Sequence, residues 1–128
     1  MRYLSDEWIN AVATEVATDS ALTSAATSHT VSVTQVVTDT PFGEVAYHLV
    51  SRGGVVSFGK GEVPGDITFS QSYATAVDIV MGRLNAAEAF INGNVRFRGD
   101  HEKVIAAQPL FAALDGVFTR VRARTTFD

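Results

Sequence analysis

The first part of the chain carries apolar residues at helical spacing. Trp8, Val12 and Val16 recur every four residues, so they share one face of a predicted amphipathic helix that ends near Asp19. Ser5 stands before this pattern and supplies a hydroxyl that can cap the helix. We therefore predict one helix that packs its apolar face on the rest of the chain.

The next part alternates with a period of two. Residues 30–38 form a β-branched run, residues 45–49 and 55–58 flank a glycine-containing turn, and residues 66–70 alternate again. This pattern predicts four strands in an antiparallel meander with one apolar face. Residues 20–30 are rich in Ala, Ser and Thr with weak periodicity, so they either extend the first helix or form a loop.

The period returns to 3.6 residues after the fourth strand. Ser72 is expected to cap a helix that ends at Gly82, and Asn85 to cap a short helix that ends at Gly93. Both glycines stand where a left-handed residue ends a helix, a conformation that costs other residues about 1 kcal/mol or more. Residues 95–98 then alternate and predict a short strand.

The last part of the chain is predicted to be helical. Asp100 is expected to cap a helix, and Pro109 either kinks this helix or begins a new one. The elements thus follow the order α-ββββ-αα-β-α, an α+β fold that we expect to form a single domain over residues 1–128. A wide apolar stripe follows the proline, made of Leu110, Phe111, Leu114, Val117, Phe118 and Val121.

Composition narrows the possible functions. A formal net charge of -4 gives no overall attraction to phosphate backbones or anionic lipids, so we expect no nucleic acid partner and at most transient membrane contact. The absence of cysteine excludes disulfides and thiolate metal sites. No stretch is long enough to cross a bilayer and neither end carries a targeting or lipidation signal, so we expect a cytoplasmic protein.

The sequence does not predict catalysis or metal binding. His29, His48 and His101 are scattered and lack the spacing of metal ligands. Asp78 is expected on the solvated side of its helix, and Glu88 in a capping box. Since neither a phosphate-binding loop nor a nucleophile elbow is present, we expect no catalytic residue, no metal and no cofactor.

A series of glycines, small residues and aromatic residues follows the helix that begins at Tyr73. It reads Gly82-Arg83-Leu84-Asn85-Ala86-Ala87-Glu88-Ala89-Phe90-Ile91-Asn92-Gly93-Asn94-Val95-Arg96-Phe97-Arg98-Gly99-Asp100. This stretch resembles the sterol carrier protein family, the SCP2-like non-specific lipid-transfer proteins, and the agreement in element order extends over roughly residues 30 to 123. The resemblance implies a five-stranded, mainly antiparallel sheet covered on one face by helices. It also implies an apolar tunnel between these layers that accepts sterols or fatty acyl chains.

The resemblance further implies that apolar residues of both layers line the ligand. The terminal helices around Pro109 are the expected movable cover. Whether the lining residues form a cavity or fill a solid core depends on their packing density. The sheet would contribute Tyr47, Leu49, Phe58, Phe69 and Phe97. The helices would contribute Phe90, Ile91, Leu110, Phe111, Leu114 and Phe118.

Two other functions fit the same pattern. A small enzyme acting on a polycyclic or acyl substrate in the same cavity would use Tyr47 or Asp78 as proton donor or acceptor. An interaction module with a solid core would bind an acidic partner through Arg120, Arg122 and Arg124. Non-catalytic binding of an apolar, lipid-like ligand by burial is the expected function, and no part of the pattern specifies an oligomeric state.

Overall fold

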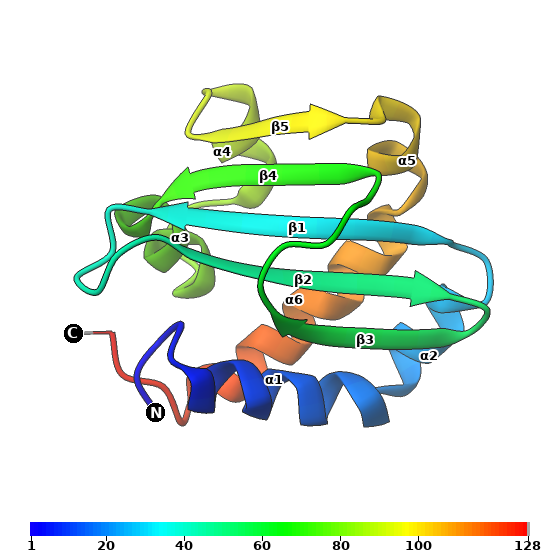
Figure 1. Ribbon diagram of the computed structural model, residues 1–128, viewed down its shortest axis with the longest axis horizontal. Helices are drawn as coiled ribbons and strands as arrows, with labels where there is room; N and C mark the ends of the chain where they lie inside the picture. Colours follow the sequence, from blue (N-terminus) through cyan, green and yellow to red (C-terminus); the bar gives the residue numbers. More distant parts are fainter. Residues whose placement is uncertain (128) are drawn as a thin grey trace.

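The computed structural model describes residues 1–127, apart from the side chains of Ala86 and Ala87. Its helices lie on one face of a sheet, which we call the inner face, and the β3–β4 connection crosses the opposite, outer face (Figure 1). In chain order the elements are α1 (Asp6–Thr18), α2 (Ser20–Ala26), β1 (Val31–Thr38), β2 (Val45–Arg52), β3 (Val55–Lys60), β4 (Ile67–Ser72), α3 (Tyr73–Val80), α4 (Ala86–Ile91), β5 (Val95–Gly99), α5 (His101–Ala106) and α6 (Gln108–Arg122).

The predicted helix boundaries are confirmed where a short-range signal sets them. The side chains of Ser5, Ser72 and Asp100 each accept hydrogen bonds from backbone N–H groups in the first turn of the helix that follows. Gly82 and Gly93, which follow α3 and α4, have φ angles of 78° and 80°. These local contacts fix where the helices stop and start around the short α4.

Two regions for which the sequence left alternatives open contain separate helices. Residues 20–26 form α2, because the Asp19 carboxylate accepts a hydrogen bond from the Leu22 N–H at 2.9 Å and caps it. The last predicted helix is divided into α5 and α6, and Pro109 lies in the first turn of α6. The prediction that Pro109 begins a new helix is therefore confirmed, whereas a kinked continuous helix is not observed.

The sheet has five strands, as predicted, in the order β3-β2-β1-β4-β5. Three pairings are antiparallel, but β4 pairs parallel with β1, with Val33 opposite Ile67. The prediction of a simple antiparallel meander through four strands is therefore wrong. Residues 61–66 cross the outer face instead, and Thr34 on β1 accepts a hydrogen bond from the Val63 N–H at 3.2 Å. This crossover carries the chain from one edge of the sheet to the far side of β1.

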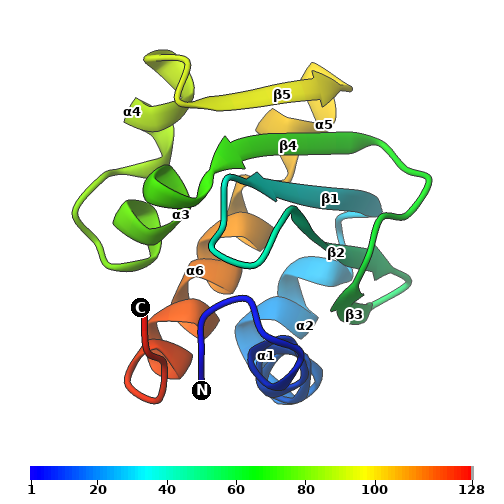
Figure 2. The ribbon, with the colours of Figure 1, turned by 60° about the vertical axis from the view of Figure 1, so that its left-hand side comes forward.

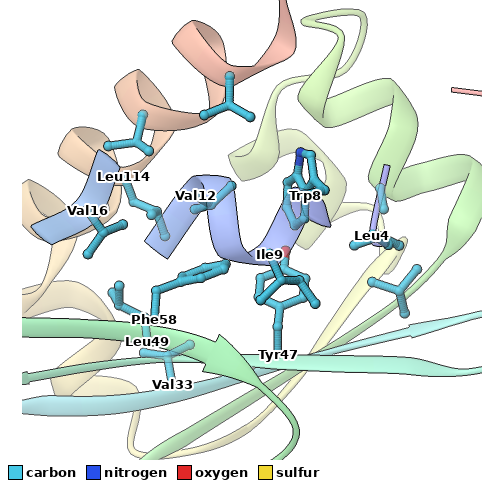
Figure 3. Close-up of a cluster of buried hydrophobic side chains, with 14 of the residues drawn as sticks. Leu4, Trp8, Ile9, Val12, Val16, Val33, Tyr47, Leu49, Phe58 and Leu114 are labelled. Atoms are coloured by element: carbon cyan, nitrogen blue, oxygen red, sulfur yellow. The ribbon is translucent and has the colours of Figure 1, made fainter. Parts of the chain in front are cut away.

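The main core lies between the inner face and the helices α1 and α6. The buried side chains of Trp8, Ile9 and Val12 from α1, of Tyr47 and Leu49 from the sheet, and of Leu114 from α6 gather in this core (Figure 3). In the view turned by 60°, α1 and α2 lie below the β3 side of the sheet, α6 runs from beside them toward α5, and α4 lies beside β5 (Figure 2). Within residues 1–127, no helix has the length and apolar character required to span a membrane.

Candidate functional site

The aromatic residues of the inner face fall into two groups. The first group, here called the closed cluster, consists of Trp8, Tyr47, Phe58 and Phe118. Trp8 stacks on Phe118 with ring centroids 5.7 Å apart and meets Tyr47 edge-on at 5.8 Å. Tyr47 in turn lies 5.2 Å from Phe58. Because α1 and α6 both cover this group, it belongs to the main core.

The second group, here called the open cluster, lies on the β4–β5 side of the inner face and consists of Phe69, Phe90, Phe97 and Phe111. The ring centroid of Phe69 is 6.1 Å from that of Phe97 and 6.0 Å from that of Phe111. Phe90 of α4 lies 5.6 Å from Phe97, and His101 of α5 meets the same ring edge-on at 4.5 Å. Phe90 is nevertheless 40% exposed. Short helices therefore cover this end of the sheet incompletely.

The residues predicted to line the ligand differ in how deeply they are buried. Tyr47, Leu49, Phe58, Leu110 and Leu114 are buried. Phe69, Phe97, Phe111 and Phe118 are partly buried and pack against the same core.

Ile91 does not face inward as the predicted helix wall expected. Its side chain is 80% exposed, whereas Ala89 on the same helix is fully buried. Successive residues of an α-helix are 100° apart, so a residue two positions after a buried one points to the opposite side. With Ala89 against the sheet, Ile91 is directed to solvent.

A polar pair that the sequence reading missed lies on the inner face between the two clusters. Gln35 on β1 stands opposite Tyr47 of β2 on one side and Phe69 of β4 on the other. The Gln71 side-chain amide donates a hydrogen bond to the Gln35 side-chain carbonyl at 3.4 Å. The signal was available, because each glutamine occupies an inward position in a strand whose other inward residues are apolar, such as Val33.

The two candidate proton donors or acceptors, Tyr47 and Asp78, lie in different environments. Tyr47 is 4% exposed, and its burial raises the pKa of its hydroxyl well above the usual value, so the group stays protonated. Burial, together with the neighbouring Tyr47 and Tyr73, likewise raises the pKa of Tyr3. Asp78 instead forms a surface ion pair with Arg83 at 2.9 Å. Across the described part of the chain, no group of three His, Asp or Glu side chains is arranged to hold a metal ion.

The basic residues near the C-terminus already have partners within the chain. Arg120 pairs with Asp19 at 2.7 Å, and Arg124 lies 3.5 Å from Glu15. Arg122 donates a hydrogen bond to the Val80 carbonyl at 3.1 Å. The Leu22 N–H and then Arg120 lower the pKa of Asp19, which keeps that carboxylate charged. These contacts leave less free positive charge for an acidic partner.

Two open hollows have polar linings. One, of about 340 Å³, lies under the β3–β4 connection and includes Thr34, Thr68 and Arg98. The other, of about 580 Å³, lies where β4 runs into α3 and includes Gln71 and Arg96. Because both linings are predominantly polar and contain none of the predicted ligand-binding residues, neither hollow is the expected apolar tunnel.

Comparison with known proteins shows similarity to the sterol carrier proteins, in sequence and in structure. The model of the SCP-2 sterol transfer family matches residues 10–112. A crystal structure of sterol carrier protein 2 superposes with a TM-score of 0.76 at 20% identity, covering 92% of this chain and 98% of that one. A conserved hypothetical protein from Thermus thermophilus, described as possibly a sterol carrier protein, gives a TM-score of 0.71 at 22% identity, over 94% and 90% of the two chains.

A third solved structure comes from an insect. The palmitated SCP2L2 protein of Aedes aegypti gives a TM-score of 0.51 at 17% identity, over 70% of this chain and 72% of that one. At these identities the solved structures show a shared fold, which agrees with the resemblance seen in the sequence. No curated protein sequence matches the chain.

Proposed function

The chain belongs to the SCP-2 sterol transfer family, and from this premise we propose that it binds and transfers an apolar, lipid-like molecule without chemical change. The whole chain, residues 1–128, would act as one binding domain. The ligand would lie against the open cluster, between the β4–β5 side of the sheet and the helices α4, α5 and α6. Phe69, Phe90, Phe97 and Phe111 would form its immediate contacts, with Leu110 and Leu114 behind them.

The observation that carries this proposal is the contrast between the two aromatic clusters. Three of the four closed-cluster rings are buried, whereas none of the open-cluster rings is. Phe90 of the open cluster is 40% exposed and the adjacent Ile91 is 80% exposed. Exposed apolar surface of this kind costs free energy and commonly marks a binding site. A bound acyl chain would cover the open cluster without disturbing the main core.

The other predicted lining residues have supporting roles in this proposal. Tyr47, Leu49, Phe58 and Phe118 would hold the back wall in place, because they pack in or against the main core. Ile91 would stand at the mouth of the site. α6 would form a fixed wall, since Leu110, Leu114, Val117 and Val121 are all buried along it. The movable cover would then be α4, which contacts mainly β5, rather than the terminal helix that the sequence suggested.

The expected binding free energy favours moderate affinity and low selectivity. Burial of on the order of 400 Å² of apolar surface contributes about 10 kcal/mol at roughly 25 cal/mol per Å². Association costs of about 4–15 kcal/mol offset much of this gain. At the low end of these costs about 6 kcal/mol remains, which corresponds to a Kd of tens of micromolar. Such affinity, with tolerance of ligand shape, suits a carrier that must release its cargo.

Non-catalytic binding is favoured over catalysis by the positions of the candidate acids and bases. The Tyr47 hydroxyl is buried with a raised pKa, and the Asp78 carboxylate is held by Arg83 at the surface. The raised pKa makes Tyr47 unsuited to act as a base near neutral pH, and the Asp78 carboxylate is already engaged by a cation. The palmitated state of the Aedes aegypti relative supports a fatty acyl chain as the class of ligand.

A titration with a fluorescent fatty acid tests the proposal. We expect saturable binding in the micromolar range and displacement by unlabelled palmitate. Phe97→Ala should weaken binding by about tenfold or more, because burial of this ring area contributes more than 1.4 kcal/mol. Val55→Ala is the matched control, since Val55 is 68% exposed on the far edge of the sheet. Absence of saturable binding to the folded wild-type chain would overturn the proposal.

A further inference from the structure

The geometry points to a polar anchor inside the ligand site. We propose that Gln35 and Gln71 bind an uncharged hydroxyl at one end of the ligand, such as that of a fatty alcohol or a sterol. This inference rests on the proposed function and adds to it the chemical class of the ligand headgroup.

The first observation is the position of the pair. Gln35 lies between Tyr47 and Phe69 in the rows that cross the sheet, and Gln71 lies between Val37 and Val95. Both glutamines thus project from the wall that carries the aromatic clusters. Gln71 is the last inward residue of β4 before α3 begins at Tyr73, so the pair lies toward the end of the strand.

The second observation is the hydrogen-bonding capacity that the pair retains. A side-chain amide has two donor hydrogens and an accepting oxygen. The bond of 3.4 Å joins the Gln71 amide to the Gln35 carbonyl, and the described residues supply no other hydrogen bond to either side chain. Both donor hydrogens of Gln35 and the carbonyl oxygen of Gln71 therefore remain available. A hydroxyl can accept from the former and donate to the latter at once.

The third observation is energetic. Both side chains are partly buried, on a wall where Val or Leu would pack without cost. Placing an amide there costs free energy unless hydrogen bonds compensate, and one long bond compensates only in part. A ligand hydroxyl would supply the missing bonds, whereas an alkyl end would leave the amides unsatisfied.

The surroundings determine which headgroup fits. The residues beside the pair in its rows are Tyr47, Phe69, Val37 and Val95, all of which are uncharged at neutral pH. None of these row neighbours can pair with a carboxylate, whose burial there would carry a large desolvation cost. The pair is therefore suited to a neutral hydroxyl rather than to a free fatty acid headgroup.

The test compares ligands of one chain length in displacement of the uncharged dye Nile red. For wild type and for Gln35→Leu/Gln71→Leu, the Kd values of decan-1-ol, decane and decanoate are measured. We expect the Kd of decan-1-ol to rise about tenfold relative to that of decane in the double variant, as loss of about two hydrogen bonds predicts. The milder Gln71→Met should give about a threefold change and retains the volume of the side chain. Gln108→Leu, which alters an exposed glutamine on α6, should leave the ratio unchanged.

The outcomes separate this inference from the proposed function. If decane and decan-1-ol both displace the dye but their ratio is the same in all variants, the anchor is overturned and the carrier function stands. If the double variant weakens decanoate more than decan-1-ol, the pair binds a charged headgroup and the hydroxyl assignment is wrong. If Nile red and the three ligands all fail to bind folded wild-type protein, both proposals are overturned together.

Discussion

Trp8 stacks on Phe118 with ring centroids 5.7 Å apart and ring planes inclined by 19°. The contact joins the first helix of the chain to the last one, over the β2–β3 side of the sheet. Trp8 is also the only tryptophan, so its emission reports on this junction. The stacked pair therefore links α1 to α6, and we propose that these helices keep their positions when a ligand binds.

Truncation of Phe118 should destabilise the fold. Phe118→Ala removes the stacked ring and leaves a cavity beside Trp8, and we expect a loss of about 2–4 kcal/mol in the free energy of unfolding. Urea unfolding followed by Trp8 fluorescence measures it. Ile91→Ala is the control, since Ile91 is 80% exposed and its truncation should change stability by less than about 0.5 kcal/mol. Equal effects of the two substitutions would contradict the assigned packing.

The parts of the fold that could be predicted from sequence are those with local causes. A cap such as Ser72 or Asp100 is recognised because the side chain and the N–H groups it accepts from are two or three residues apart. The end of α3 at Gly82 is likewise local, because it depends on the φ angle of that one glycine. Strand identity followed from alternation, which needs no knowledge of the partner strand.

The parts that were missed depend on contacts distant in sequence. Alternation assigns β4 as a strand but carries no information about its neighbour, and the parallel pairing with β1 needs the crossover at residues 61–66. The outward direction of Ile91 depends on which side of α4 meets β5, which Ala89 decides. The hydrogen bond between Gln35 and Gln71 likewise needs the β1–β4 pairing before the two side chains come together.

Gly99 illustrates a close approach that only glycine allows. It has a φ of 128°, and a Cβ there would overlap the backbone carbonyl of Asp66. Gly99→Ala should therefore cost about 3 kcal/mol or more, measured by thermal unfolding. Gly43 has a φ of 99° with open space around it, so Gly43→Ala isolates the backbone cost of about 1 kcal/mol. If the two variants unfold at the same temperature, the overlap at Gly99 is not significant.

The stability of the chain should depend on pH through Asp66. The Lys103 ammonium, 3.0 Å away, and then the Ser32 N–H lower the pKa of this carboxyl below its usual value. Because the folded-state pKa is the lower one, the stabilisation is complete above the unfolded-state pKa of about 3.9 and is lost as the pH falls through the folded-state pKa. The difference in unfolding free energy between wild type and Asp66→Asn should therefore be constant near pH 7 and shrink below about pH 4.

Urea unfolding at several pH values measures this difference. Asp115→Asn, at an exposed position on α6, should differ from wild type by less than about 0.5 kcal/mol throughout. A difference for Asp66→Asn that grows as the solution becomes acidic would contradict the assigned direction of the pKa shift.

Hydrogen exchange should show which helix moves when ligand binds. α4 contacts mainly β5, while α6 buries four residues along its length, so local opening should cost less at α4 than at α6. Addition of palmitate should slow amide exchange in α4 and α5, and change little in α6, whose amides are already protected. Exchange that is fast throughout residues 109–128 and slows on binding would instead support a cover hinged at Pro109. Slowing confined to α1 would place the ligand at the closed cluster and contradict the assignment of the site to the β4–β5 side.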